Sequence, residues 1–509
     1  MSHNKAFEMA PPIDGTKEVY HNEPSFDVET GSTSSLHGKL NKYASRFRME
    51  ETGFEHVPPE DQNERSLVNA GTMWLSANLN ISSFAIGALG ITLFFVGFWD
   101  GVAAIIFFNA ISILPVCYYS TFGSQLGLRQ MIISRYSFGI LGTPVVAALN
   151  VLACIGWSAS NAIVGAQILK AIGGDFPLWA GILIITLVTG FITIFGYKIV
   201  HMYEKVSWIP SIIIFFILIA GIKQSGAFVT VPMGTGANEA GAILSFGSAI
   251  YGFGTGWTSY AADYTIFQNR SVKKWKIFAV TYAGLFFPLV FCEIVGLAAG
   301  TLTMNEANTI YSEAYESNSV GGLTGRILDR YHGGGKFCLV VLALSVIANN
   351  VPNNYSGALS AQAILPWFAK IPRYLWNILI TLIILAVAIP AANHFALFFK
   401  NLLNVLAYWL AIYAVVLLEE HLLFRKGFAG YDVRDWNNFA RLPLGLGAIA
   451  ALCAGVAGMV LGMYQVYWEG PIAHKIGEFG GDVGFELSFA FAGLVYPLAR
   501  TLELKFIGR

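Results

Sequence analysis

The sequence predicts an all-α membrane protein with twelve transmembrane helices, and three observations lead to this fold class. Of the 509 residues, 55% are hydrophobic and only 12% are charged, whereas soluble domains have roughly 45–50% and about 25%. Twelve apolar runs approach the ~20 residues that a membrane-crossing helix needs. Lys and Arg are spread unevenly over the connections between those runs. This composition excludes an ordinary soluble enzyme, and the balance of 31 basic and 31 acidic residues disfavours a nucleic-acid binder.

The chain divides into four predicted parts. Residues 1–67 are polar, rich in Ser, Thr, Glu and Asn, and interrupted by two Pro-Pro pairs, which predicts a disordered cytoplasmic tail. Residues 68–420 are predicted to form a ten-helix core, residues 421–503 a cytoplasmic loop with helices 11 and 12, and residues 504–509 a cytoplasmic C-terminal tail. The twelve apolar runs are 70–97, 101–120, 139–169, 177–197, 206–222, 242–266, 277–300, 337–362, 374–391, 396–417, 444–467 and 484–503.

The basic residues predict the orientation of these spans. With twelve spans and a cytoplasmic N-terminus, 24 of the 31 Lys and Arg residues fall on the inner side and 7 on the outer side. Cytoplasmic connections are enriched in these residues. The count therefore predicts that both termini lie in the cytoplasm.

Two spans have polar, glycine-rich middles: the first at Trp74–Phe84 and the sixth at Tyr251–Tyr260. Irregular backbone is tolerated at membrane depth only where it lines a cavity or is buried in protein. Both helices are therefore expected to be broken. A first and a sixth broken helix fit two inverted five-helix repeats with the substrate near the bilayer midplane, and the last two spans then lie outside the repeat.

Amides concentrate in two further spans. In the third span, Asn150, Trp157 and Asn161 share one helix face. In the eighth, residues 348–356 place four asparagines around Pro352, whose ring frees a carbonyl from the helical ladder. The spacing leaves two pairs open, because Asn350 lies three residues and Asn349 four residues before Asn353.

The side chains near these breaks suggest a ligand class. Trp157 and Trp257 offer aromatic planes, and the amides offer donors and acceptors without a fixed charge. A flat, neutral, hydrogen-bonding heterocycle fits this set, and a nucleobase is the natural candidate, since aromatic stacking and Asn pairing both serve base recognition. An amino acid remains a lesser alternative, since a broken-helix terminus can match its charges.

Several motifs in order along the chain resemble the nucleobase-cation symporter-1 family, within it the fungal purine-cytosine permease branch. The resemblance covers nearly all but the first 45 residues, and its motifs are Glu50–Glu60, Ser76–Ser83, Gly156–Trp157, Gly196–Glu204, Gly256–Trp257 and Asn349–Asn353. It implies a LeuT-like five-plus-five inverted-repeat fold with broken helices 1 and 6 and two extra C-terminal helices. It also implies proton-driven uptake of cytosine, adenine, guanine and hypoxanthine across the plasma membrane.

The resemblance also implies roles for individual residues. Trp157 and Trp257 stack on the base, Asn161, Asn350 and Asn353 hydrogen-bond it or shape the pocket, and Ser83 contributes from the first broken helix. The residues expected to shape the site without binding the base directly are Asn78, Asn80, Asn349 and Pro352. Each group also has a structural interpretation: packing for the two tryptophans, and satisfaction of the backbone around Pro352 for the amides.

No metal and no cofactor are expected, and the coupling ion is expected to be a proton. A sodium site in relatives uses hydroxyls of the eighth helix, and Ser345 has no second hydroxyl beside it, which disfavours sodium. The acids expected to carry or gate the proton are Glu204, Asp263 and Glu293, because an ionisable group within the membrane is costly. Glu204 and Asp263 also fit interfacial ion pairs with nearby lysines.

The expected partners are the nucleobase, the proton and the lipid bilayer, with no nucleic acid and no obligate protein partner. A transporter of pyridoxine or another small heterocycle is the alternative within the same family, and a non-transporting nutrient receptor is a lesser one. An enzyme is disfavoured, because the spans contain no nucleophile–base pair and no metal cluster. The ranking among the bases, the proton stoichiometry and the oligomeric state stay open.

Overall fold

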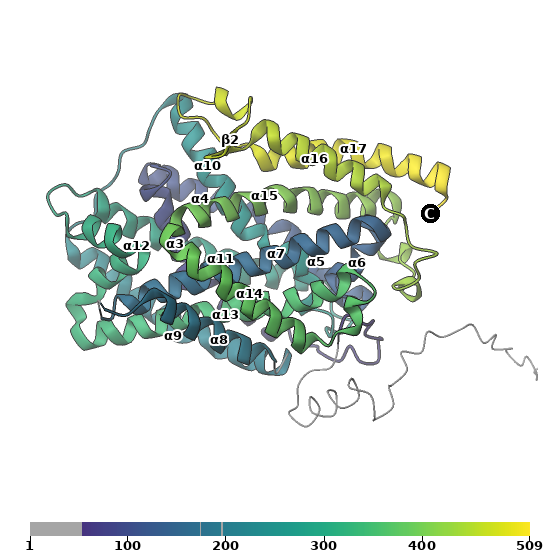
Figure 1. Cartoon of the computed structure of the whole chain (residues 1–509), viewed down its shortest axis with the longest axis horizontal. Coiled ribbons are helices and arrows are strands. Elements are labelled where there is room, and N and C mark those ends of the chain that lie inside the picture. The colour runs from purple at the N-terminus through teal and green to yellow at the C-terminus, as the bar shows by residue number, and fades with distance from the viewer. Residues whose placement is uncertain (1–52, 174, 195–196) are drawn as a thin grey trace, which may run out of the picture. The chain divides into compact units, whose positions relative to one another are not determined.

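The structure, a computed structural model, describes residues 53–173, 175–194 and 197–509, with the side chains of residues 197–204 outside the described set. These ranges are mostly helical (Figure 1). Within them the two strands, β1 (Tyr464–Gln465) and β2 (Trp468–Glu469), form one short antiparallel hairpin. The prediction of an all-α protein is therefore confirmed for the described part of the chain.

Each of the twelve predicted apolar runs coincides with one helix or with two consecutive helices. The first run contains α2 (Val68–Asn78) and α3 (Ile81–Thr92), and the sixth contains α10 (Gly236–Thr255) and η1 (Gly256–Tyr264). The others contain α4 (Phe98–Ser112), α5 (Leu114–Leu126), α7 (Arg135–Lys170), α8 (Leu178–Ile194), α9 (Tyr197–Ser225), α11 (Lys274–Thr301), α13 (His332–Ile364), α14 (Arg373–Ala391), α15 (Phe395–Glu419), α16 (Leu446–Gly462) and α17 (Gly484–Ile507).

Among the described residues, two further α-helices lie outside the predicted runs. The short α6 (Gln130–Ile133) follows α5, and α12 (Ile310–Leu328) lies in the connection between α11 and α13. Helix α12 does not form a continuous apolar run, because polar residues such as Glu313, Glu316 and Asn318 interrupt it. Helix α12 forms one wall of a large cavity.

Several described helices meet the requirements of a membrane span. By length and composition, six stretches can cross a bilayer, and the bent pair in the first run makes a seventh. Large apolar side chains are exposed on many of the helices. They include Phe107, Leu152, Phe216, Leu382, Leu494 and Leu498. Exposed apolar surface of this extent marks contact with lipid or with a partner. The chain is a multi-pass membrane protein.

The first run is broken as predicted. Helix α2 (Val68–Asn78) and helix α3 (Ile81–Thr92) are bent by 47°. Asn80 has extended backbone, and its Oδ1 accepts hydrogen bonds from the N–H groups of Ser82 at 2.7 Å and Ser83 at 3.2 Å. Free N–H groups at a helix start need such a cap. The break is therefore set by a residue at the break itself, Asn80.

The sixth run is also broken. Helix α10 (Gly236–Thr255) gives way at Gly256 to a 3₁₀ segment, η1 (Gly256–Tyr264), within which Tyr260 leaves helical backbone with φ of −146°. Glycine permits the close packing that positions this break: a Cβ at Gly252 would lie 2.0 Å from the carbonyl oxygen of Leu403 on α15. The sixth span is thus held against α15 by direct backbone contact.

Glycines also allow α3 and α11 to pack closely against each other. A Cβ at Gly87 would lie 1.8 Å from the carbonyl oxygen of Glu293, and one at Gly296 would lie 1.9 Å from that of Phe84. Small residues allow membrane helices to approach this closely. Helix α3, the second half of the first span, and the middle of α11 therefore form one packed unit.

The last part of the predicted tail differs from expectation. Residues 1–52 lie outside the described residues, but residues 53–67 pack on the helices. Val57 donates its N–H to the carbonyl of Gly127 at 2.8 Å, and the buried Gln62 donates Nε2 to the carbonyl of Ile266 at 2.8 Å. The polar composition of residues 53–67 does not predict these contacts. They are hydrogen bonds to backbone carbonyls, which any sequence carries. Residues 53–67, predicted to belong to a disordered tail, are therefore ordered against the helices.

Helices α16 and α17 lie side by side and pack against α15 (Figure 1). Glu420, in the π-helical turn that ends α15, accepts hydrogen bonds from Tyr496 Oη at 2.8 Å and Arg500 Nε at 3.2 Å. These contacts fix α17 to the core at one end of the bundle.

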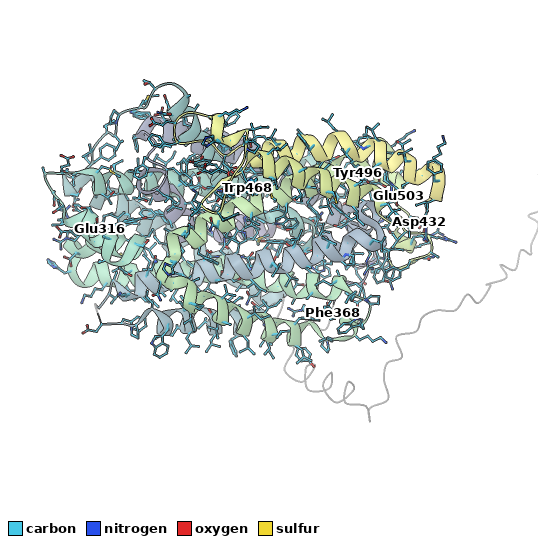
Figure 2. All side chains as sticks on the ribbon, turned by 45° about the horizontal axis from the view of Figure 1, so that its top comes forward. Glu316, Phe368, Asp432, Trp468, Tyr496 and Glu503 are labelled. Carbon is cyan, nitrogen blue, oxygen red and sulfur yellow. The ribbon has the colours of Figure 1, made fainter. Side chains whose placement is uncertain are left out.

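Three charged residues of the connections lie at two opposite ends of the bundle. Figure 2 shows Asp432 and Glu503 close to one end and Glu316 at the other. In the predicted topology the first two belong to the inner side and Glu316 to the outer side. The separation is what alternating connections of a helix bundle produce.

Candidate functional site

Trp157 and Trp257 meet at one small void beside the break in the sixth span. The lining of this void comprises Trp157, Phe253, Gly256, Trp257, Tyr260, Asn349 and Asn353. Helices α7, α10 and α13 and the segment η1 supply these side chains. The walls close so tightly that no water-sized sphere fits between them. No charged side chain lies among these lining residues. The backbone kink at Tyr260 in η1 borders the void.

Trp157 stands in an aromatic column. Its ring contacts Phe253 at a centroid distance of 5.0 Å and meets Phe399 edge-on at 6.1 Å. A Cβ at Gly256 would lie 3.1 Å from the indole Nε1, so glycine lets the ring lie against the sixth-span backbone. One side of the void is therefore an indole held by packing.

Trp257 joins the two broken spans. Its Nε1 donates a hydrogen bond to Asn78 Oδ1 at 3.1 Å, and Asn78 is the last residue of α2. The indole also makes edge contacts with Trp74 at 5.4 Å and with Tyr260 at 5.6 Å. Asn78, predicted to shape the site, thus orients the ring of Trp257.

The amides form one buried network. Asn161 donates Nδ2 to Asn349 Oδ1 at 2.8 Å and to Asn350 Oδ1 at 2.7 Å. Asn353 donates Nδ2 to Asn349 Oδ1 at 3.0 Å, and Tyr260 donates its hydroxyl to Asn353 Oδ1 at 2.7 Å. Four predicted residues are therefore brought together across α7 and α13.

The amides of this network differ in whether they border the void. Asn349 and Asn353 line the void, whereas Asn350 donates Nδ2 to the carbonyl of Ser158 at 3.2 Å and stands behind it with Asn161. The Oδ1 of Asn161 is buried and has no hydrogen-bond partner among the described residues. The direct base contacts predicted for Asn161 and Asn350 stay predictions.

The remaining predicted residues of the first and eighth spans lie close to the first break. Ser83 donates Oγ to the carbonyl of Asn78 at 2.6 Å, and Asn80 caps α3. Ser345 accepts the N–H of Ile81 at 3.3 Å and donates to the carbonyl of Leu342 at 2.6 Å.

Pro352 does not interrupt α13, which continues through it. Its carbonyl accepts the hydroxyl of Tyr264, on η1, at 2.9 Å. The eighth span is thereby linked to the sixth beside the void.

Three aromatic residues of the site are missing from the sequence predictions: Phe253, Tyr260 and Phe399. Phe253 and Tyr260 belong to the glycine-rich run that marks the sixth break, so their membership in that run was the available signal. Phe399 lies on α15 and reaches Trp157 only through tertiary packing. Nothing in the local sequence distinguishes it from other apolar residues.

The two described acids have different surroundings. Asp263, in η1, accepts the N–H of Gln130 at Oδ1 at 2.8 Å, and the guanidinium of Arg129 donates to its carbonyl at 2.9 Å. Glu293, in α11, is fully buried and accepts Asn109 Nδ2 at 2.7 Å, and its Oε1 has no hydrogen-bond partner among the described residues. The side chain of Glu204 lies outside the described residues.

Two helices broken in mid-span, with buried polar groups between them and no charged residue at the void, define a membrane transporter of the broken-helix class. The fold agrees with solved transporters. Mhp1, a nucleobase-cation-symport-1 family transporter solved in a closed conformation with bromovinylhydantoin bound, has a TM-score of 0.66 at 14% identity, covering 90% of this chain and 96% of that one. Mhp1 in an inward-facing conformation gives 0.64 at 13% identity, covering 90% and 96%.

Sequence comparison identifies the family. The family described as permease for cytosine/purines, uracil, thiamine, allantoin matches residues 57–470, and the chain belongs to this family. The resemblance to fungal purine-cytosine permeases is confirmed, and the chain is a permease rather than an enzyme.

Curated relatives match over nearly the whole chain. The purine-cytosine permease fcyB of Emericella nidulans is 47% identical over 93% of this chain and 93% of its own length. The purine-cytosine permease FCY2 of Saccharomyces cerevisiae is 42% identical over 96% and 92%. The vitamin B6 transporter TPN1 of the same yeast is 34% identical over 92% and 90%.

Proposed function

We propose that this protein imports cytosine and the purines adenine, guanine and hypoxanthine across the plasma membrane, coupled to protons, by alternating access. The observation that carries the proposal is the pair Trp157 and Trp257 at one uncharged void bordered by Asn349, Asn353 and Tyr260. The purine-cytosine permeases among its relatives support the same substrate class.

The base stacks between the two indoles and exchanges hydrogen bonds with the amide network. Stacking on an aromatic side chain is worth about 1–3 kcal/mol per base. Asn353 and Tyr260 bond to each other before the base arrives, and an amide offers both a donor and an acceptor to a base edge. Because the walls touch, the base enters only when the sixth span moves away from α7 and α13.

The proposed membrane arrangement has twelve spans in two inverted five-helix repeats followed by α16 and α17, with both termini in the cytoplasm. Three observations support it: helices coincide with all twelve apolar runs, the first and sixth spans are broken, and the basic residues favour one side. One bundle then rocks against the other around the site.

The proposed coupling ion is a proton, and Glu293 has the surroundings of its carrier. A buried carboxylate without a cation is costly, and a proton removes that cost. Asn109 is the one described hydrogen-bond partner of Glu293, whereas Asp263 has Arg129 and a backbone N–H beside it. Ser345 touches the first break, but a single hydroxyl is a poor sodium site, which favours the proton.

Uptake of radiolabelled cytosine by cells that lack their own permeases tests the proposal. We expect accumulation that a protonophore abolishes and that excess adenine or hypoxanthine inhibits. Full surface expression without cytosine accumulation would refute the substrate, and accumulation unaffected by the protonophore would refute proton coupling.

Transport of pyridoxine is the second candidate, because the vitamin B6 transporter TPN1 is also a full-length relative. Pyridoxine is a flat, polar heterocycle of the kind that the two indoles accept. Competition by excess pyridoxine in the cytosine assay, followed by uptake of labelled pyridoxine, separates the two. A nutrient receptor would bind substrate stoichiometrically and accumulate none.

A further inference from the structure

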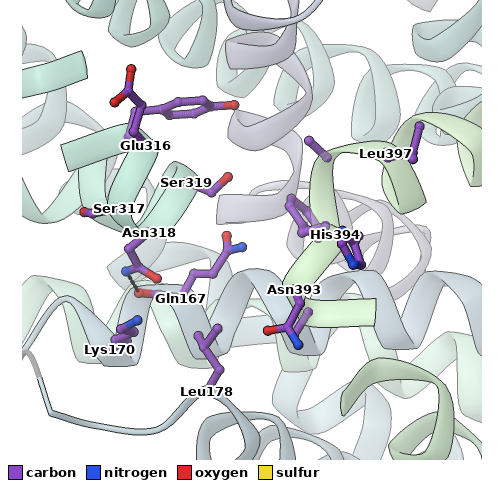
Figure 3. Close-up of a pocket in the computed structure, with 14 residues that line it drawn as sticks. Gln167, Lys170, Leu178, Glu316, Ser317, Asn318, Ser319, Asn393, His394 and Leu397 are labelled. Atoms are coloured by element: carbon purple, nitrogen blue, oxygen red, sulfur yellow. Dashed lines mark hydrogen bonds between the residues drawn. The ribbon is translucent and has the colours of Figure 1, made fainter. Parts of the chain in front are cut away.

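A second and much larger cavity opens near the end of α7, about 590 Å³ in volume (Figure 3). Its walls come from the end of α7, from α12 and from the turn between α14 and α15. In the proposed topology these segments face outward. The volume lies within the roughly 300–1,000 Å³ typical of small-molecule sites.

Gln167 gives this cavity an unsatisfied polar group. Its side chain is 3% exposed, and Figure 3 shows it reaching from α7 into the space between Ser319 and Asn393. The Oε1 of Gln167 is buried and has no hydrogen-bond partner among the described residues. A buried amide oxygen without a partner is costly, so a ligand that donates a hydrogen bond to it is favoured.

The other lining groups fit a neutral ligand. Lys170 and Glu316 balance in charge, Tyr315 and Asn393 offer polar atoms, and Phe395 offers an aromatic face. A few convergent polar groups beside an aromatic surface suit a flat molecule with hydrogen-bonding edges. Amides and aromatic rings also border the void between Trp157 and Trp257, which has no charged lining residue.

An aromatic column connects the two spaces. Phe395, in the cavity wall, stacks on Phe399 at a centroid distance of 5.1 Å, and Phe399 meets Trp157 at 6.1 Å. On α7, Gln167 lies six residues beyond Asn161, which is about 9 Å along the helix axis. In the proposed topology the cavity therefore lies on the outer side of the central void.

The wall opposite Gln167 contacts the first broken span. Tyr315 on α12 and Thr92 at the end of α3 share a hydrogen bond at 2.9 Å. Asn318 donates Nδ2 to the carbonyl of Gln167 at 2.8 Å, where α12 bends at Ser319 with φ of 49°. A ligand in the cavity would thus touch elements that also frame the central site.

We propose that this cavity is an outer binding site that holds the nucleobase, a neutral planar heterocycle, before it reaches the void between Trp157 and Trp257. The proposal rests on the proposed function for its ligand class. It adds a second site, with Gln167 as its main acceptor, to the central one.

Protection of a cysteine at the cavity rim tests the outer site directly. The chain carries Ser317→Cys, a near-isosteric change at an exposed lining residue, with Cys453→Ser because the other cysteines are buried. Cells are labelled with a membrane-impermeant maleimide, with and without cytosine or adenine. We expect the base to slow labelling, both with the central site intact and with Trp157→Ala and Trp257→Ala.

Matched variants assign the protection to Gln167. We expect Gln167→Leu, which keeps the side-chain volume, to abolish protection, and Asn393→Ala, at an exposed position, to weaken it. Gln224→Leu, the same change at an exposed position at the end of α9, should leave protection intact. Surface expression is measured for every variant.

Two results would overturn the outer site. One is normal uptake by the Ser317→Cys chain without any protection by base. The other is protection that disappears with the central substitutions, because it then reports a movement caused by the central site. Failure of the proposed function looks different: the wild-type chain takes up no base, whatever happens to the labelling.

Discussion

The break between α2 and α3 is capped by a side chain, whereas the break between α10 and η1 has no such cap. At the first, Asn80 bonds the N–H groups that open α3. At the second, glycines rest on neighbouring helices, as Gly252 does on Leu403. The first geometry is preset by adjacent residues, and the second depends on tertiary packing. We infer that the sixth-span break is the one that shifts when the neighbouring helices move.

The two breaks also carry different chemistry. Beside the first lie Ser345 and, against α3, the buried Glu293. The second carries Trp257 and Tyr260, which border the void. The hydrogen bond from Trp257 Nε1 to Asn78 Oδ1 joins them. In this account the proton is held on the first-span side and the base on the sixth-span side, and this bond links the two.

The largest effect is expected from removing a close helix contact. Gly87→Val should separate α3 from α11, and Gly252→Val should separate α10 from α15, because each new Cβ would overlap a carbonyl oxygen. Both variants should lose folded protein at the surface, measured by surface labelling together with uptake. Gly333→Val adds the same side chain where no atom lies within 4 Å and should behave as wild type.

Loss of the sixth-span indole is expected to come next. Trp257→Ala removes base stacking worth about 1–3 kcal/mol, a factor of about 5–150 in affinity, and should raise the KM for cytosine accordingly. Trp257→Phe keeps a ring but not the bond to Asn78, so its KM should fall between the two. Equal KM values for wild type and Trp257→Ala would remove Trp257 from the site.

Substitution of Glu293, beside the first span, should change coupling to the proton rather than affinity for the base. Glu293→Gln keeps the bond from Asn109 in reach but cannot carry the proton. One charge moving through 100 mV supplies about 2.3 kcal/mol, nearly fifty-fold in accumulation, and we expect this variant to lose up to that factor and its response to a protonophore. Glu306→Gln, at an exposed position, is the control. Normal protonophore-sensitive accumulation by Glu293→Gln would exclude Glu293 as the carrier.

The smallest effect is expected at the cap of the first break. Asn80→Ala removes an N-cap worth about 0.5–2 kcal/mol and should lower the thermal stability of the purified protein. Asn80→Ser retains a capping oxygen and should recover most of the loss. If both variants match wild type, the first break is not set by its cap.

The sequence could predict both breaks because their signals are local. Asparagines and glycines interrupt otherwise apolar spans, and the same residues make the cap at Asn80 and the close contact at Gly252. The shared face of Trp157 and Asn161 follows from helical spacing alone.

Other features depend on tertiary structure. Spacing leaves Asn349 and Asn350 equivalent with respect to Asn353, and only the packing of α13 on α7 places Asn349 at the void and turns Asn350 toward Ser158. The outer cavity needs α12, whose polar sequence gives no span signal. The burial of Gln62 could not be predicted either, because its hydrogen-bond partner Ile266 lies far along the chain.

Equilibrium binding of radiolabelled cytosine to the purified full-length protein tests the central claim most directly. We predict that Trp157→Ala raises the Kd by about 5–150-fold, because the base loses one stacking partner. Trp99→Ala, at a tryptophan that is 60% exposed, should leave the Kd unchanged. An unchanged Kd in Trp157→Ala, with the protein folded, would contradict the account.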